Sequence, residues 1–114
     1  AQRACEMINN DLSRHVVIVK GAGTIICQPG CPLLLNTSGN PGMATGGMGD
    51  VLSGIVGALL CQGLRPLEAA AAATFIHGAA ADNLYRQAGV GYTAREVADM
   101  LPSTLQTIFG PNES

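Results

Sequence analysis

The chain has 114 residues, enough for one domain at most. It is 47% hydrophobic and only 12% charged, whereas about a quarter of the residues in a soluble domain are ordinarily charged, so we expect apolar surface that packs against another part of a protein or a second subunit. The net charge of −2 gives no electrostatic basis for binding nucleic acid or an anionic membrane, and the longest apolar run, residues 51–61, is too short to cross a bilayer.

The cysteines give no sign of a disulfide framework or a metal site. No Cys-x-x-Cys pair and no histidine at zinc spacing accompanies them, and nothing resembles a signal peptide. We therefore predict reduced thiols in a cytoplasmic protein and no metal ligands from this chain.

A helix followed by short strands is predicted for the first third of the chain. The helix covers residues 2–13. Residues 15–20 are a continuous, β-branched apolar run bounded by glycine, which is typical of a buried strand, and residues 24–28 and 33–36 are predicted as two further strands. This order of elements indicates an α/β sheet at one of its edges.

The turn between the first two strands, Lys20-Gly-Ala-Gly-Thr24, lies at a strand end, where open α/β folds bind ligands. It lacks the Gly-x-x-x-x-Gly-Lys order of a Walker motif, and it lacks the third glycine and the following helix of a dinucleotide fingerprint. On the residues alone, a tight β-turn is the favoured interpretation.

Glycine is concentrated in residues 39–54, and an apolar helix is predicted within and beyond this segment, over residues 51–62. Glycine permits sharp turns and close approach of the backbone to a ligand. The start of a helix adds unpaired N–H groups and the positive end of its dipole, a combination that suits an anion, most often a phosphate.

Asp50 stands at the junction of the glycine segment and the helix. A lone carboxylate beside a bound phosphate would be repelled unless it had a role, and a general base that takes a proton from an attacking hydroxyl is such a role. The alternative is that Asp50 is only the N-cap of the helix, a position that Asp favours. Because a cap does not need a preceding run of glycines, the pattern favours a functional Asp50.

The rest of the chain is predicted to be helical. The helix over residues 51–62 is apolar nearly all round, so we expect it to be buried on most sides, with Gly54 and Gly57 allowing close approach of another backbone. Pro66 suits the first position of a long alanine-rich helix that covers residues 67–87.

The last helix is predicted to start at a capping box, Thr93-Ala-Arg-Glu96, and to extend to about Leu101. Pro102 then allows a final helical turn or two to Phe109. The tail, residues 110–114, is expected to fray.

Two polar residues of the alanine-rich helix receive structural interpretations. A lone histidine on such a face is usually a packed core residue with a satisfied ring, so His77 is left outside the catalytic set. Asp82, five positions later, is expected to hydrogen-bond nearby or to face solvent.

The string Asn40-Pro-Gly-Met-Ala-Thr-Gly-Gly-Met-Gly-Asp50 resembles the signature of bacterial ADP-dependent NAD(P)H-hydrate dehydratases, which belong to the ribokinase-like superfamily. The upstream Val16-Val-Ile-Val-Lys-Gly-Ala-Gly-Thr24 and the downstream His77-Gly-Ala-Ala-Ala-Asp82 fit in the same order and at similar spacing. A Gly-Asp pair alone would suit many ribokinase-like kinases, but the longer string is much more specific. The resemblance covers about residues 1–109.

The resemblance implies a fold and a domain organisation. Residues 1–109 are expected to form the C-terminal portion of a ribokinase-like three-layer α/β/α fold, helix-rich after residue 50. The family's catalytic domain is more than twice this length, so the chain is expected to be a piece that lacks the N-terminal half of the domain and, in many bacterial members, a preceding epimerase domain. Homo-oligomers are also expected from the family.

The resemblance further implies repair of hydrated nicotinamide cofactor, in which ADP drives the dehydration of (6S)-NADHX or NADPHX to NADH or NADPH, with release of AMP and phosphate. Mg²⁺ is implied by phosphoryl transfer in this superfamily, although no ligand cluster for it is visible in this chain. Asp50 is implied as the catalytic base and as a substrate-binding residue. The nucleotide-binding residues implied are Lys20, Gly21, Ala22, Gly23, Thr24 and Gly49, and the amides implied to hold the phosphoryl group are those of Gly46, Gly47, Met48 and Gly49.

Two alternatives stay open. A ribokinase-like vitamin or sugar kinase would share the glycine segment and Asp50, but it would leave a stable phosphorylated product. The other alternative is that the chain alone is inactive and is a packing or assembly piece, because the missing half of the domain carries part of the substrate pocket.

Overall fold

The computed structural model of the chain describes residues 15–20, 24–43, 46–89 and 91–110. The helix predicted over residues 2–13, the middle of the Lys20–Thr24 turn and nearly all of the predicted tail lie outside these residues. The described elements are a sheet, a short 3₁₀ turn (η1, Pro41–Met43) and a set of helices.

The sheet consists of β1 (Val17–Val19), β2 (Thr24–Cys27) and β3 (Leu34–Asn36). The strands are antiparallel and lie in the order β1-β2-β3, with Ile18 opposite Ile26 and Ile25 opposite Leu35. Their β-branched and leucine side chains suit a pleated, half-buried surface, and all three predicted strands are confirmed, each somewhat shorter than expected. This sheet brings Lys20, directly after β1, close to Gly49.

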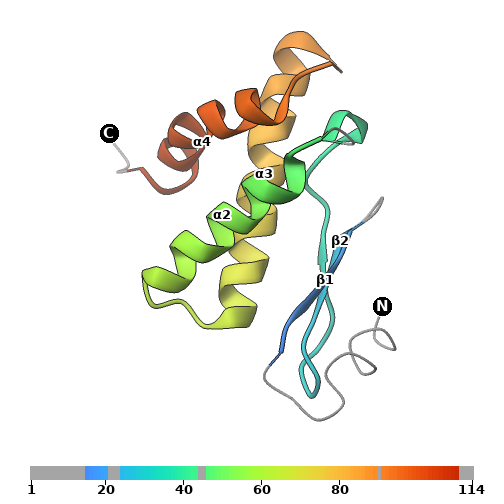
Figure 1. The fold of residues 1–114 in the computed structure, drawn as a ribbon, viewed down its shortest axis with the longest axis vertical. Coiled ribbons are helices and arrows are strands. Elements are labelled where there is room, and N and C mark those ends of the chain that lie inside the picture. The colour runs from blue at the N-terminus through green and yellow to red at the C-terminus, as the bar shows by residue number, and fades with distance from the viewer. Residues whose placement is uncertain (1–14, 21–23, 44–45, 90, 111–114) are drawn as a thin grey trace.

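The helices are α2 (Met48–Cys61), α3 (Pro66–Ala88) and α4 (Ala94–Phe109). Pro66 occupies the first position of α3, and Thr93 caps α4 by accepting a hydrogen bond from the Glu96 amide, as the sequence predicts. α3 contacts α2, α4, β2 and β3. Figure 1 shows α2 and α3 side by side, α4 at one end of this pair, and the sheet beside the helices.

The predicted helical end at Phe109 is confirmed, but the expected break between a helix to about Leu101 and further turns from Pro102 is absent. α4 runs through Pro102 without interruption. A proline inside a helix removes one backbone hydrogen bond, but here the segment beyond it is held by other contacts. Thr104 is 1% exposed, its hydroxyl donates to the Met100 carbonyl at 2.8 Å, and it accepts from Asn83 Nδ2 of α3 at 3.3 Å. Tertiary packing therefore outweighs the local cost of the proline.

The core lies where α3, α4 and the first residue of α2 meet. Its buried members are Met48, Ala80, Ala81, Leu84, Tyr92 and Val97. The small side chains of α3 allow close packing there. The core thus fixes the start of α2 against the middle of α3.

The expected burial of α2 on most sides is wrong for the described chain. Only Met48 and Leu52 of this helix are buried, and outside the neighbouring backbone of the helix no described atom lies within 4 Å of a Cβ built at Gly54 or Gly57. Other large apolar side chains are also exposed, including Leu35 at 64% and Phe109 at 65%. This surplus apolar surface agrees with the expectation drawn from composition. In the described part of the chain, no helix has both the length and the hydropathy needed to cross a membrane.

Candidate active site

The first turn of α2 forms a backbone surface with unpaired donors. Gly47 is the N-cap residue, with φ of 86°, a left-handed conformation that favours glycine. It offers no side chain to the helix, and the first bond within the helix runs from the Val51 amide to the Gly47 carbonyl at 3.2 Å. The N–H groups of Met48, Gly49 and Asp50 precede that bond and point out of the helix end, where they suit an anion.

Met48 and Asp50 occupy this turn in different ways. The helix begins at Met48, three residues earlier than predicted, because the Met48 side chain is buried at 7% exposure and anchors the turn in the core. Asp50 is the third helical residue and is exposed. It is not the N-cap, so the cap interpretation is wrong. A carboxylate here is favoured by the helix dipole and is free to act on a ligand.

Lys20 reaches this turn from the sheet. It follows β1 directly, and its Nζ lies 3.3 Å from the point that a Cβ of Gly49 would occupy. Residues 29 positions apart therefore meet, and the lysine adds a full positive charge to the positive end of the α2 dipole. The glycine at position 49 leaves the space that the ammonium group and a ligand need.

The remaining predicted site residues are less fully placed. Gly21, Ala22 and Gly23 lie outside the described residues. Thr24 is the first residue of β2 and is paired with Asn36 of β3, so it lies next to the strand that leads into the glycine segment. Gly46 is exposed in the turn before α2.

A hydrogen-bond network fixes the segment before the glycine turn. Asp82 of α3 accepts from the Gly39 amide at 3.0 Å and from Asn40 Nδ2 at 2.8 Å. Asn40 Oδ1 in turn accepts from the Gly42 amide at 3.0 Å and from the Tyr92 hydroxyl at 2.6 Å. Asp82 thus hydrogen-bonds nearby, one of the two expected outcomes. Sequence reasoning missed the roles of Asn40 and Tyr92; the Asn-Pro-Gly turn was the available signal.

The Tyr92 hydroxyl is expected to stabilise this segment. Burial raises the pKa of Tyr92, so the phenol stays protonated and donates to Asn40 at neutral pH. Tyr92→Phe should lower the free energy of unfolding by about 0.5–1.5 kcal/mol in urea denaturation. Tyr85→Phe, at an exposed tyrosine of α3, is the matched control and should change it by no more than about 0.5 kcal/mol. Equal effects of the two changes would contradict a role for the Asn40 bond.

His77 of α3 is buried at 5% exposure, which confirms its core position, but its ring is not satisfied as expected. Its Nε2 is buried without a hydrogen-bond partner among the described residues. Burial, and secondly the positive charge of Lys20, lower the pKa of His77, so the ring is neutral at neutral pH. The Lys20 effect also places His77 within electrostatic reach of the site.

This lowered pKa predicts a dependence of stability on pH. The unfolded chain binds a proton at His77 near the ordinary pKa of 6.5, whereas the folded chain resists it. Stability from this group is therefore present above pH 6.5 and is lost as the pH falls below it. The free energy of unfolding, measured in urea, should fall more between pH 7.5 and pH 5.5 in the unmodified protein than in His77→Leu. The same loss in both would contradict the prediction.

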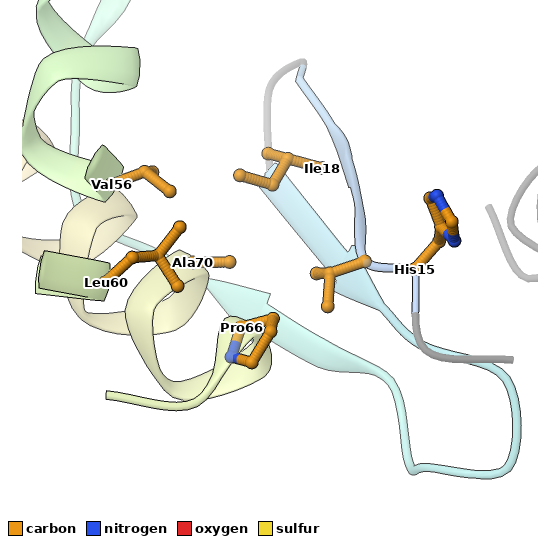
Figure 2. A pocket seen from close by; sticks show the side chains of 7 residues that line it. His15, Ile18, Val56, Leu60, Pro66 and Ala70 are labelled. Carbon is orange, nitrogen blue, oxygen red and sulfur yellow. The ribbon is translucent and has the colours of Figure 1, made fainter. Parts of the chain in front are cut away.

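A separate apolar cavity of about 340 Å³ lies between β1 and the helices. Figure 2 shows Ile18 of β1 facing Val56 and Leu60 of α2 and Ala70 of α3 across it. None of the predicted site residues lines this cavity, and its walls offer little to a phosphate. It is therefore a packing surface and not the candidate active site.

The described residues do not form a metal centre. No group of three or more His, Cys, Asp or Glu side chains among them is placed to hold a metal ion. Asp50 is a single carboxylate on the first turn of α2. The residues present therefore do not fit a cation held by the protein alone.

The fold matches that of known proteins. The chain superposes on a ribokinase-like superfamily protein from Enterococcus faecalis with a TM-score of 0.77 and 31% identity, over 93% of this chain and 36% of that one. An ADP/ATP-dependent NAD(P)H-hydrate dehydratase from Bacillus subtilis, co-crystallized with ATP/Mg²⁺, gives 0.79 and 30%, over 92% of this chain and 38% of that one. The class of fold is therefore ribokinase-like, as expected.

Sequence comparison identifies the family. The model of the NAD(P)H-hydrate dehydratase family matches residues 2–103. The bifunctional NAD(P)H-hydrate repair enzyme of Escherichia coli is 51% identical over 96 residues, which are 84% of this chain and 18% of that enzyme. The chain belongs to the NAD(P)H-hydrate dehydratase family. It spans less than two fifths of each of these relatives.

Proposed function

We propose that the protein containing this chain is an ADP-dependent NAD(P)H-hydrate dehydratase, and that the chain supplies its phosphate cradle and its catalytic base. Family membership supports the reaction. The single observation that supports the site is the approach of Lys20 to Gly49 at the start of α2, beside Asp50. A positively charged side chain, exposed helix amides and one carboxylate are groups that suit phosphoryl transfer to a hydroxyl.

In the proposed first step, the hydroxyl on the hydrated nicotinamide ring attacks the β-phosphorus of ADP. Asp50 accepts the hydroxyl proton, and the bond from that phosphorus to the bridging oxygen breaks to release AMP. Negative charge builds up on the transferring phosphoryl oxygens. The amides of Gly46, Gly47, Met48 and Gly49, with Lys20, stabilise this charge without having to reorganise.

In the proposed second step, the phosphorylated ring loses inorganic phosphate. The lone pair of the ring nitrogen assists departure of the phosphate from the carbon that carried the hydroxyl. The neighbouring ring carbon then loses a proton to solvent, which restores the double bond of NADH or NADPH. The net change is removal of water from the ring and cleavage of ADP to AMP and phosphate.

Nucleotide contacts are proposed for Lys20, Gly21, Ala22, Gly23, Thr24 and Gly49. Mg²⁺ is proposed as the accompanying cation, since phosphates and water can provide most of its ligands. The described residues give it no ligand cluster, so no step is assigned to it.

Other parts of the protein are proposed partners of this chain. Residues 1–109 are assigned to the C-terminal portion of the dehydratase domain. The exposed apolar side chains of β3 and α2, such as Leu35 and Leu60, are proposed to pack against the rest of that domain or a second subunit. An epimerase domain and a homo-oligomer are further proposals, and the chain alone is proposed to be inactive.

Product analysis tests this function. The full-length protein is incubated with ADP and hydrated NADH, and NADH absorbance, AMP and free phosphate are measured. A dehydratase forms all three in equal amounts. A stable phosphorylated product without NADH would instead identify a kinase and overturn the proposal.

A further inference from the structure

His77 and Lys20 both lie toward the start of α2, His77 on the α3 face that packs there and Lys20 beside Gly49, although the proposed function gives a role only to Lys20. His77 shares a face of α3 with Ala80, Ala81 and Leu84, which pack with Met48 in the core. It therefore lies about one helical turn from the contact between α3 and the first residue of α2. Gly78, the next residue, packs against Ser38 in the segment that leads to the glycine turn.

A purely structural histidine explains this arrangement poorly. A buried polar atom without a partner costs about 1–3 kcal/mol, and native structures keep few of them. The His77 Nε2 is such an atom among the described residues, and the ring is 5% exposed. A leucine would fill the same space without that loss. We therefore expect the unsatisfied nitrogen to gain a hydrogen-bond donor when a ligand binds.

Lys20 is the group suited to become that partner. Its ammonium group has three donors on a flexible stem, and it is exposed beside Gly49. The neutral His77 ring has a lone pair to offer on one of its nitrogens. One ammonium N–H can then point to the imidazole while the others point to an anion.

We propose that His77 is a positioning residue for Lys20. When a nucleotide phosphate binds, its Nε2 accepts a hydrogen bond from the Lys20 ammonium and holds that charge over the first turn of α2. This role rests on the proposed function, because it needs a phosphate at the α2 turn. His77 itself does not touch the nucleotide.

The test measures ADP affinity by calorimetry on the full-length protein at pH 7.5. His77→Leu removes the acceptor and should raise the Kd for ADP roughly 5- to 30-fold. His77→Gln keeps an oxygen acceptor near the position of Nε2 and should bind within about threefold of the unmodified protein. Without nucleotide, His77→Leu should unfold at the same or a higher temperature, since a buried unsatisfied atom has been removed.

A double-mutant comparison shows whether His77 acts through Lys20. Lys20→Met should weaken ADP binding, and adding His77→Leu in that background should change the Kd by no more than about twofold. If Lys20→Met weakens binding but His77→Leu does not, the inference fails while the proposed function stands. If Lys20→Met leaves ADP binding unchanged, the phosphate cradle itself is wrong. If His77→Leu and His77→Gln both lower the unliganded melting temperature and the ADP affinity alike, His77 is structural and the inference also fails.

Discussion

Asp50→Asn in the full-length protein is expected to lower kcat roughly 10²- to 10⁴-fold while the KM for ADP changes only a few-fold. The amide keeps the size of the side chain but cannot accept a proton from the substrate hydroxyl. Asp50 lies on the exposed side of the first turn of α2, so the change should not disturb the core. Steady-state kinetics with hydrated NADH and ADP give both constants.

Asp99→Asn is the matched control for this experiment. Asp99 is also an exposed carboxylate within a helix, and its substitution changes the net charge by the same amount. The kcat of the Asp99→Asn variant should stay within about twofold of the kcat of the unmodified protein. A kcat for Asp50→Asn within a few-fold of the control would remove the base assignment, whatever happens to nucleotide binding.

Gly78→Ala is expected to lower the free energy of unfolding by about 1–3 kcal/mol. A Cβ at this position would lie 2.1 Å from Ser38 Oγ and 2.8 Å from the Ser38 carbonyl carbon. The hydroxyl can rotate, but the backbone atom cannot move without shifting the segment before the glycine turn. This loss outweighs the gain of about 1 kcal/mol that alanine normally gives in a helix.

Ala79→Gly, one position further along α3, reverses the substitution and serves as the control. Alanine should be the more stable residue there by about 1 kcal/mol, as in an ordinary helix. Urea unfolding of both variants gives the comparison. If the protein with alanine is more stable than the protein with glycine at both positions, Ser38 does not approach α3 as closely as in this structure.

Much of the fold follows from local sequence signals. The three strands were predicted from short apolar runs, the first of them β-branched, and the starts of α3 and α4 from Pro66 and Thr93. The helical turns from Pro102 to Phe109 were predicted, but their unbroken continuation from the preceding helix was not, because it depends on the contact between Thr104 and Asn83 of another helix. The burial predicted for α2 was wrong for a similar reason. An apolar pattern indicates that a helix will be buried, but it does not identify the segment that covers it.

The candidate site was predictable only in part. The glycine turn, the start of α2 and Asp50 are adjacent in sequence, so their arrangement follows from helix geometry. The approach of Lys20 to Gly49 depends on how the sheet packs against the helices. The bonds of Asn40 to Asp82 and Tyr92 join residues more than 40 positions apart, and the unsatisfied Nε2 of His77 is visible only from its burial.

A crystal structure of the full-length protein with ADP tests the central proposal most directly. We predict phosphate oxygens about 3 Å from the Gly49 amide nitrogen and from Lys20 Nζ, with the Asp50 carboxylate facing the β-phosphate. ADP bound elsewhere, with no phosphate at the first turn of α2, would contradict the account.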